Sequence, residues 1–369
     1  VTIYENFAPT LDRLNRDEEH LLKFLQSELG TSASIDDRGR ARFTGDFKQS
    51  RVADALDEYV ESFVTCSECG SPDTRLVEAR GGTIAFREDP RFLCSPEAFD
   101  EWADGDPPYR HENFYRHMRR ETGYLMADGD PVGGAWNFDD ENREFPGEGY
   151  EPPEPPRFDP DGTTAAVAEW VAEAYGEEGY DGPPYGTGWA DPEPFFWPVT
   201  RADARAALSS FIEERLPAFG PYQDAMLEGE WSMNHALVSS SLNVGLLRPD
   251  EVIEAAVDAY EDGDAPVESV EGFVRQVLGW REFVRHAYRR EPGMAGANAL
   301  EATEPLPEFF WTGETEMACL ADAVEGVRAR GYSHHIQRLM ILSNFATTFG
   351  VEPKQLNEWF HAGYVVTQW

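Results

Sequence analysis

Cysteine is scarce in this sequence of 369 residues, which holds only Cys66, Cys69, Cys94 and Cys319. Four cysteines in 369 residues do not form the disulfide framework of a small secreted protein, so the expected compartment is a reducing cytoplasm. Cys66 and Cys69 lie close together, as CSEC, and such a pair supplies two of the four thiolates of a tetrahedral zinc ribbon. No second pair follows at ribbon spacing. We therefore expect half a zinc site, in which bound zinc is doubtful.

Basic residues are also few, and lysine is the rarest of them. The chain has 31 basic residues against 69 acidic ones, a net charge of −38, and its lysines are Lys23, Lys48 and Lys354. A nucleic-acid partner normally selects the opposite sign of charge. An acidic, lysine-poor surface suits a halophilic cytosol at molar salt, where the Debye length is about 3 Å and self-repulsion costs little. Local basic islands are therefore more informative than the total charge.

Long apolar runs are absent as well. No stretch of about 18 apolar residues occurs, so we expect no membrane-spanning helix and no membrane partner. No charged and then apolar leader opens the chain, which begins at Val1.

The pattern along the chain predicts a multi-domain protein, with a small α+β domain followed by an all-α domain. Residues 1–65 form the α+β part, and residues 66–86 are a junction that carries the CSEC pair. Residues 87–140 predict helices rich in aromatic and basic side chains. Residues 141–197 are rich in Pro, Gly and Glu, which predicts a linker without helix or strand. Apolar residues at helical spacing fill residues 198–369.

Local signals place several elements within these regions. Leu21, Leu25 and Leu29 recur at helical spacing before Gly30, which predicts a helix that ends there. The run ASIDDRGRARFTG at 33–45 predicts a hairpin.

Two further signals mark helix starts. Ser50 is expected to open a helix with its apolar face at Val52, Leu56 and Tyr59. Thr200 followed by Asp203 has the pattern of a helix N-cap.

Two basic islands stand out on the acidic chain. In REFVRHAYRR, Arg281, Arg285 and Arg289 recur every four residues and so share one helix face. RHENFYRHMRR at 110–120 is a similar island. Arginines interleaved with aromatics suit a DNA phosphate backbone. The alternative is a solvated face that relieves repulsion among the acids.

Adjacent histidines and several tryptophans are the remaining candidates for chemistry. His334 and His335 are not a metal motif, because helical ligands are usually four residues apart. They could act as acid and base, since imidazole changes charge near neutral pH. Trp280, Trp311 and Trp359 could serve electron transfer or simply fill an aromatic core.

A long series of motifs between residues 83 and 364 resembles one family. The motifs are EDPRFLCSPEAFDEWADGD, FYRHMRRETGYLM, PVGGAWNFDDENR, LPAFGPYQDAM, SSLNVGLL, SVEGFVRQVLGWREFVR, LPEFFWTGETEMACL, GYSHHIQRLMILSNFA and LNEWF. In this order they resemble the iron–sulfur bacterial cryptochromes and photolyases, which include the prokaryotic (6-4) photolyases. The resemblance implies an all-α domain that binds FAD, and UV-damaged DNA as the partner.

The resemblance also implies roles for individual residues. His334 and His335 match the pair implicated in lesion chemistry, and Trp311 and Trp359 match electron-transfer aromatics. Phe360 stands where a redox-active tyrosine can occur in the family. Arg281, Arg285 and Arg289 are the expected DNA contacts. The residues that match flavin-binding positions are Ser239, Ser240, Ser241, Asn243, Gln276, Trp280, Arg281, Arg338 and Asn344.

Cys319 matches the first of four cysteines that hold an iron–sulfur cluster in this family. The sequence ends at VVTQW, without the other three cysteines, and one thiolate cannot hold such a cluster. The α/β antenna domain of the family does not precede the match. From this resemblance we expect weak FAD retention and little repair by a truncated flavoprotein.

The first part of the chain resembles a different family. The stretch from YENFAPTLDRLNRDEEHLLKFLQSELG through FVTCSECGSPDTRL, at about residues 3–78, is similar to the beta subunit of archaeal translation initiation factor two. That family continues into a second CxxC, whereas this chain changes character between residues 78 and 87. The resemblance implies initiation-factor subunits as partners.

Three hypotheses follow from the sequence. The first is a photolyase-like flavoprotein that moves an electron in light from reduced FAD to a DNA photolesion, with activity impaired by truncation. The second is a translation protein whose N-terminal domain docks on an initiation-factor subunit. The third is a non-functional gene fusion.

Overall fold

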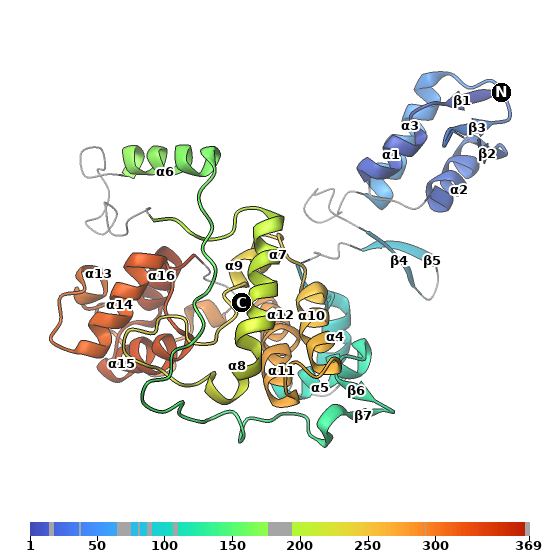
Figure 1. Cartoon of the computed structure of the whole chain (residues 1–369). Coiled ribbons are helices and arrows are strands. Elements are labelled where there is room, and N and C mark those ends of the chain that lie inside the picture. Colours follow the sequence, from blue (N-terminus) through green and yellow to red (C-terminus); the bar gives the residue numbers. More distant parts are fainter. Residues whose placement is uncertain are drawn as a thin grey trace. The chain divides into compact units, whose positions relative to one another are not determined.

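This computed structural model describes residues 1–14, 18–36, 38–64, 75–79, 82–86, 91–105, 110–175, 194–291 and 293–365. The chain divides into two compact units, Val1–Pro90 and Arg91–Trp369, called unit 1 and unit 2 below (Figure 1). Cys66 and Cys69 lie outside the described residues, so the expected half zinc site stays a prediction. Among the described helices, none is long and apolar enough to cross a membrane.

Unit 1 is the small α+β domain expected from the sequence. Its three-stranded antiparallel sheet has the strand order β1-β3-β2, and Leu25, Ala41, Phe43 and Tyr59 are buried in its core. The elements are β1 (Thr2–Tyr4), α1 (Phe7–Leu14), α2 (Glu18–Leu29), β2 (Ala33–Ile35), β3 (Ala41–Phe43), α3 (Gln49–Phe63), β4 (Arg75–Ala79) and β5 (Gly82–Phe86).

The local predictions for unit 1 are confirmed. Helix α2 ends at Leu29, and Gly30 has φ of +63°, a left-handed conformation that glycine adopts without strain. Strands β2 and β3 pair as the predicted hairpin. Helix α3 begins at Gln49, one residue before Ser50.

Unit 2 is helical, with β6 (Met126–Ala127) and β7 (Asp130–Pro131) as a minimal hairpin. Its first helical elements are α4 (Pro96–Gly105), α5 (His111–Thr122), η1 (Val132–Gly134), α6 (Gly162–Tyr175), α7 (Arg201–Ser210), η2 (Phe211–Arg215), α8 (Leu216–Tyr222), α9 (Ser239–Asn243) and α10 (Pro249–Glu261). The remaining ones are α11 (Val267–Val274), η3 (Arg275–Arg281), α12 (Glu282–Arg290), η4 (Met294–Gly296), α13 (Phe309–Thr312), α14 (Ala318–Arg330), η5 (Gln337–Ser343), α15 (Asn344–Phe349) and α16 (Pro353–Gly363).

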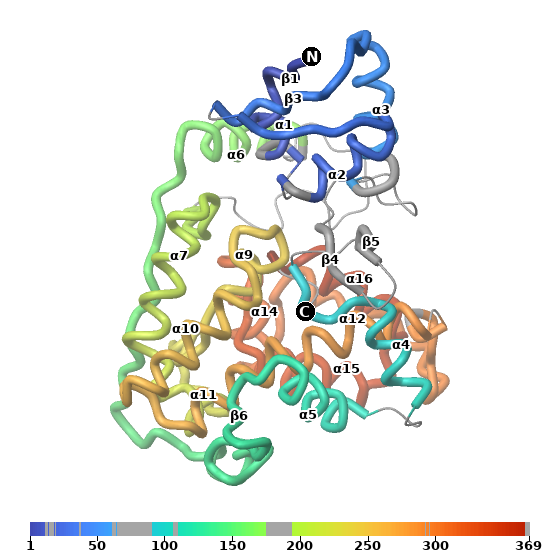
Figure 2. Tube along the Cα trace, turned by 90° about the vertical axis from the view of Figure 1, so that its right-hand side faces the viewer, coloured from blue at the N-terminus to red at the C-terminus, as the bar shows by residue number. Residues whose placement is uncertain are grey.

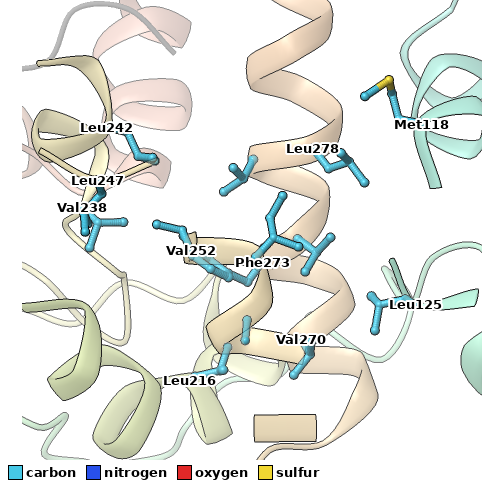
Figure 3. Packing of buried hydrophobic residues seen from close by; sticks show 14 of the residues in the cluster. Met118, Leu125, Leu216, Val238, Leu242, Leu247, Val252, Val270, Phe273 and Leu278 are labelled. Carbon is cyan, nitrogen blue, oxygen red and sulfur yellow. The ribbon is translucent and has the colours of Figure 1, made fainter. Parts of the chain in front are cut away.

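Two apolar cores hold unit 2 together. In the larger one, the continuous run α11–η3–α12 packs between α5 on one side and α8, α9 and α10 on the other, with Phe273 and Leu278 at its centre (Figure 3). The smaller core joins α13, α14, η5 and α16 around Trp359 and Phe310. Helix η3 has π-type hydrogen bonding, which shifts the side chains that follow it on the helix surface.

The tract 141–197 contains helix α6, so the prediction that it lacks helix is wrong. Residues 163–175 contain no proline or glycine and are rich in alanine, the best helix former. The Asp161 carboxylate caps the helix by accepting the Thr164 N–H at 2.7 Å. Residues 141–161 run as an extended path along unit 2 to reach α6 (Figures 1 and 2).

Candidate functional site

A cavity of about 500 Å³ opens in unit 2, within the size range of ligand pockets. Its walls come from elements far apart in the sequence: α8, α9, the η3 turn, η5 and the residues after α16. Aromatic and charged side chains alternate around it. The lining side chains include Trp197, Phe219, His235, Ser239, Phe273, Gln276, Trp280, Arg281, His335, Arg338 and Tyr364.

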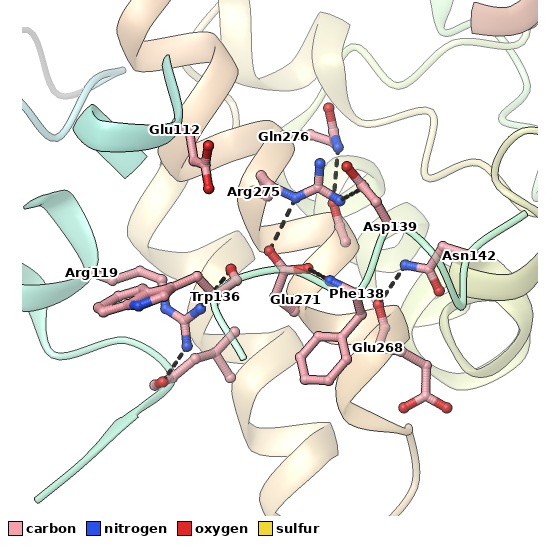
Figure 4. Close-up of polar contacts among 12 residues, drawn as sticks. Glu112, Arg119, Trp136, Phe138, Asp139, Asn142, Glu268, Glu271, Arg275 and Gln276 are labelled. Carbon is pink, nitrogen blue, oxygen red and sulfur yellow. Dashed lines mark hydrogen bonds and ion pairs between the residues drawn. The ribbon is translucent and has the colours of Figure 1, made fainter. Parts of the chain in front are cut away.

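The cavity carries a positive balance in an acidic chain. Its charged lining residues are Asp139, Asp224, Arg143, Arg275, Arg281 and Arg338. Arg275 is held by two carboxylates, because its Nε donates to Glu271 at 3.0 Å and its guanidinium also pairs with Asp139 (Figure 4). Burial raises the pKa of Glu271, and the positive charge of Arg275 offsets part of this rise. The network fixes the position of the Arg275 side chain in the cavity wall, where the two carboxylates offset its positive charge.

The arginines expected to contact DNA also contact the chain itself. Arg281 is 4% exposed and donates to the carbonyl oxygen of Arg91. The guanidinium of Arg285 lies 3.8 Å from the centroid of the Phe92 ring, and Arg289 pairs with Asp100. Contact of these residues with DNA stays a prediction. Their shared helix face contacts the segment around Phe92, which precedes helix α4.

Glu282 completes this contact from the next position on α12. Its carboxylate is fully buried and accepts the Leu93 N–H at 2.9 Å and the Cys94 N–H at 3.0 Å. Burial raises the pKa of Glu282 to about 7, against the lowering effect of those two backbone donors and of Arg281. The start of α4 is therefore held by a buried acid whose charge is sensitive to pH.

Three histidines meet at one side of the cavity. His335 lines it, while His334 is 1% exposed and packs on the His235 ring, with 4.0 Å between centroids. His235 lies 2.9 Å from the Gln223 carbonyl oxygen, so its Nε2 carries the proton. His334 accepts the Ile336 N–H at Nδ1, so its own proton lies on Nε2. No motif in the sequence singles out His235.

Both histidines that follow Ser333 are neutral near pH 7. Burial, with smaller effects of His235 and Arg338, lowers the pKa of His335 to about 4. Burial also lowers the pKa of His334 well below its usual value, and His235 and His335 add to this effect. Each ring can therefore both donate and accept a hydrogen bond.

The tryptophans occupy different places around the cavity. Trp280 lines it, is 40% exposed and stacks on His111 with 3.7 Å between centroids. Trp359 is fully buried in the smaller core, beside Phe360 and Tyr364, and donates from Nε1 to the Phe310 carbonyl oxygen at 2.8 Å. Trp311 is a half-buried member of the same core.

Tyr364 links the smaller core to the cavity and was not singled out from the sequence. Its ring lies 5.9 Å from Trp359 and also lines the cavity. Its hydroxyl lies 2.6 Å from Ser333 Oγ, and burial raises its pKa to about 12. Asn344, by contrast, is exposed and is not among the lining residues.

Helix α9 presents hydroxyl groups beside the cavity. Ser239 lines it, and among the described residues the buried hydroxyls of Ser240 and Ser241 have no hydrogen-bond partner. Ser240 and Ser241 are not among the lining residues, so of these three hydroxyls only that of Ser239 lies in the cavity wall. Asn243 lies behind them, where its Oδ1 accepts from Arg281 at 3.4 Å.

In the described part of the chain, no further metal ligands gather around Cys319, the residue that matches a cluster ligand. Cys319 is exposed, and Cys94 is buried, where burial raises the pKa of its thiol to about 12. Across the described ranges, no group of three or more His, Cys, Asp or Glu side chains lies together in a way that could hold a metal ion. The described part of the chain does not fit a four-cysteine cluster.

Comparison with known proteins identifies the two parts of the chain. The family model for deoxyribodipyrimidine photo-lyase-related proteins matches residues 52–179, and the model for the domain found in initiation factors 2B and 5 matches residues 1–88. A (6-4) photolyase of Agrobacterium fabrum is 40% identical over 333 residues, 88% of this chain and 63% of that protein. The subunit beta of translation initiation factor 2 from Halobacterium salinarum is 66% identical over 84 residues, 23% of this chain and 63% of that protein.

Among solved structures, a bacterial class III photolyase from Agrobacterium tumefaciens superposes with a TM-score of 0.51. The match covers 95% of this chain and 62% of that one, at 15% identity, and so bears on the fold alone. This chain spans less than two thirds of each of these relatives. The chain is therefore similar to the domain found in initiation factors 2B and 5 over residues 1–88 and to photolyase-related proteins over residues 52–179.

Proposed function

We propose that unit 2 binds FAD in its cavity and transfers an electron in light to a photolesion in UV-damaged DNA. The observation that carries this proposal is the convergence at one cavity of Ser239, Gln276, Trp280, His335 and Arg338, which come from three separate parts of the sequence. The similarity to a (6-4) photolyase supports the same chemistry. Bound FAD would supply the light absorption and the electron.

The residues present fit a ligand that combines a flat ring system with a diphosphate. The Ser239 hydroxyl would take phosphate oxygens, together with the cationic lining residues. Phe273 and Trp280 offer apolar surface to a ring. Gln276 already donates to the Gly272 carbonyl oxygen at 3.0 Å, which leaves its own side-chain oxygen as an acceptor for the ligand.

His335 is the residue we assign to proton handling at the lesion. It lines the cavity and is neutral near pH 7, because burial lowers its pKa to about 4. A neutral imidazole can hold a hydrogen bond to a lesion oxygen or nitrogen without bringing an uncompensated charge into the cavity. His235 lines the cavity with it and His334 packs on the His235 ring, and burial lowers the pKa of both, which keeps the two rings neutral.

An aromatic route leads from the smaller core to the cavity. Trp359 contacts Tyr364, and Tyr364 lines the cavity. Trp311 belongs to the same core. This arrangement supports a role for Trp359 and Trp311 in passing electrons inward in light.

Photoreduction tests this proposal. The full chain loaded with FAD is illuminated with blue light in the presence of a thiol reductant, and loss of the oxidised flavin absorbance is followed. We expect Trp359→Phe to slow reduction by about tenfold or more, which corresponds to about 1.4 kcal/mol or more of added barrier. Trp170→Phe, at a 59% exposed position on α6, is the control and is expected to leave the rate unchanged. Equal rates in all three proteins would contradict the proposed route.

Unit 1 supports a second, separate function as a binding domain. The 66% identity to initiation factor 2 subunit beta of Halobacterium salinarum extends over 84 residues, close to the length of unit 1, Val1–Pro90. We propose that unit 1 binds another initiation-factor subunit. Capture of purified initiation factor 2 subunits by the full chain, lost when residues 1–65 are deleted, would support this role. Equal capture without those residues would contradict it.

A further inference from the structure

A second, much smaller cavity lies behind one wall of the large one. It measures about 20 Å³ and shares Trp197, Ala236 and Leu237 with the large cavity. Its other walls are prolines and aromatic rings, together with Arg215 at the end of η2. A space of this size holds one water molecule or one small ion.

Arg215 is a buried charge of unit 2 with little compensation from its neighbours among the described residues. Its side chain is 1% exposed, and its Nε–H has no hydrogen-bond partner among the described residues. Its Nη1 donates to Ser210 Oγ at 3.3 Å. The nearest carboxylate is Glu214, 4.0 Å away and 53% exposed, and it accepts a hydrogen bond from the same Ser210 hydroxyl. Burial lowers the pKa of Arg215, which expresses the cost of holding its charge there.

Two further guanidinium groups stack on the walls of this small cavity. Arg157 lies 4.9 Å from the centroid of the Phe196 ring, and Arg330 lies 5.2 Å from that of Trp231. Phe196 and Trp231 both line the cavity. Burial and the neighbouring Arg157 lower the pKa of Arg330, so the charges of these two arginines repel each other. One cation, Arg215, therefore lines the hollow, and two more stack on rings that form its walls, on a chain that is otherwise strongly acidic.

We propose that this small cavity is a binding site for a monovalent inorganic anion, with chloride as the occupant, held by the Arg215 guanidinium. A buried charge requires an opposite charge or several hydrogen bonds, and a water molecule supplies no opposite charge. Arg215 lines the hollow, its Nε–H has no hydrogen-bond partner among the described residues, and no carboxylate is among the described lining residues. The chemistry selects a small anion that accepts hydrogen bonds and does not need to donate any. The proposal is independent of whether the large cavity binds FAD.

Crystals of the full chain grown with bromide in place of chloride test the site directly. An anomalous peak in the small cavity, within hydrogen-bond distance of the Arg215 guanidinium, is the expected result. Density there without anomalous signal would mean water and would overturn the proposal. This measurement needs no variant and so does not depend on the folding of one.

The dependence of the Tm on chloride concentration in solution is a second test. At constant ionic strength, with glutamate as the replacing anion, each tenfold rise in chloride above the dissociation constant should raise the Tm of unit 2 by about 3 °C. Arg215→Gln should abolish this dependence. Arg205→Gln, which removes the same charge at a 63% exposed side chain on α7, should keep it. The same chloride dependence in Arg215→Gln as in the wild type would overturn the proposal.

Discussion

The two units of this chain bury different kinds of side chain. Among the described residues of unit 1, the buried side chains are apolar, and the one hydroxyl among them, on Tyr59, bonds to His20 Nδ1 at 2.9 Å. In unit 2 the buried side chains include Arg119, Asn142, Arg215, Gln223, Ser232, Asn234, Ser241, Ser269, Glu271, Arg281, Glu282, His286, Ser333 and His334.

This difference agrees with the separate functions that we propose for the two units. Burying polar groups costs free energy unless each one is paired, so a core that holds many of them is organised for something besides stability. In unit 2 several of them surround the large cavity or support its walls. Unit 1 has the core of a small folding unit, which leaves its surface as the place for function.

The largest change in the free energy of unfolding is expected from a substitution of Glu282. Replacing it by alanine in unit 2 leaves the Leu93 and Cys94 N–H groups buried without acceptors. We expect a loss of about 4 kcal/mol in the unfolding free energy of unit 2. Urea unfolding followed by tryptophan fluorescence measures it. Glu261→Ala, at an exposed position on α10, is the control and should change stability little. A similarly small effect of Glu282→Ala would show that the buried acid does not hold the start of α4.

A slightly smaller effect is expected from an apolar truncation in unit 1. The Leu25 side chain is fully buried, so Leu25→Ala should destabilise unit 1 by about 3 kcal/mol. Hydrogen exchange read by mass spectrometry separates the two units. Protection should fall in the peptides of unit 1 and persist in those of unit 2. An equal loss of protection in the peptides of unit 2 would show that the two units do not fold independently.

The pH dependence of unit 2 gives the next effect in size. The pKa of Glu282 is raised to about 7 in the folded chain, against 4.5 as its ordinary value. The folded state therefore binds the proton more tightly, and stability falls as pH rises from about 4.5 through 7. Between pH 5 and pH 8, the wild type should lose about 2 kcal/mol relative to Glu282→Gln, which cannot ionise. Parallel pH profiles of the two proteins would contradict a raised pKa.

The smallest effect on stability is expected at the hydroxyls beside the cavity. Because Ser239 is exposed and lines the cavity, Ser239→Ala should change the unfolding free energy by less than about 0.5 kcal/mol. The same change should weaken FAD binding by several-fold, since a hydrogen bond to a charged group is lost. A large loss of stability with unchanged FAD affinity would reverse the role that we assign to this hydroxyl.

Local features of the fold could be predicted from the sequence because they depend on neighbours in the chain. The end of α2 at Gly30 and the N-cap of α7, where Thr200 Oγ1 accepts the Asp203 N–H, both follow from short signals. Helix α6 was missed because the composition of the whole tract 141–197 obscured an alanine-rich run without proline or glycine.

The candidate site could be predicted only in part. Ser239, Trp280 and Arg338 were singled out by resemblance and do line the cavity. His235 and Tyr364 were missed, because neither lies in a pattern that differs from an ordinary core residue. The spacing of Arg281, Arg285 and Arg289 predicts a shared helix face. It does not reveal that the face meets the chain around Phe92, because periodicity carries no information about distant partners.

Titration of the full chain with FAD tests the central claim, that the large cavity of unit 2 is the flavin site. Isothermal titration calorimetry is predicted to show saturable binding of one FAD, weakened at least about tenfold in Arg338→Gln, whose side chain lines the cavity. Arg328→Gln, on α14 and outside the lining residues, should bind as the wild type does. No saturable binding, or equal affinity in wild type and Arg338→Gln, would contradict the account.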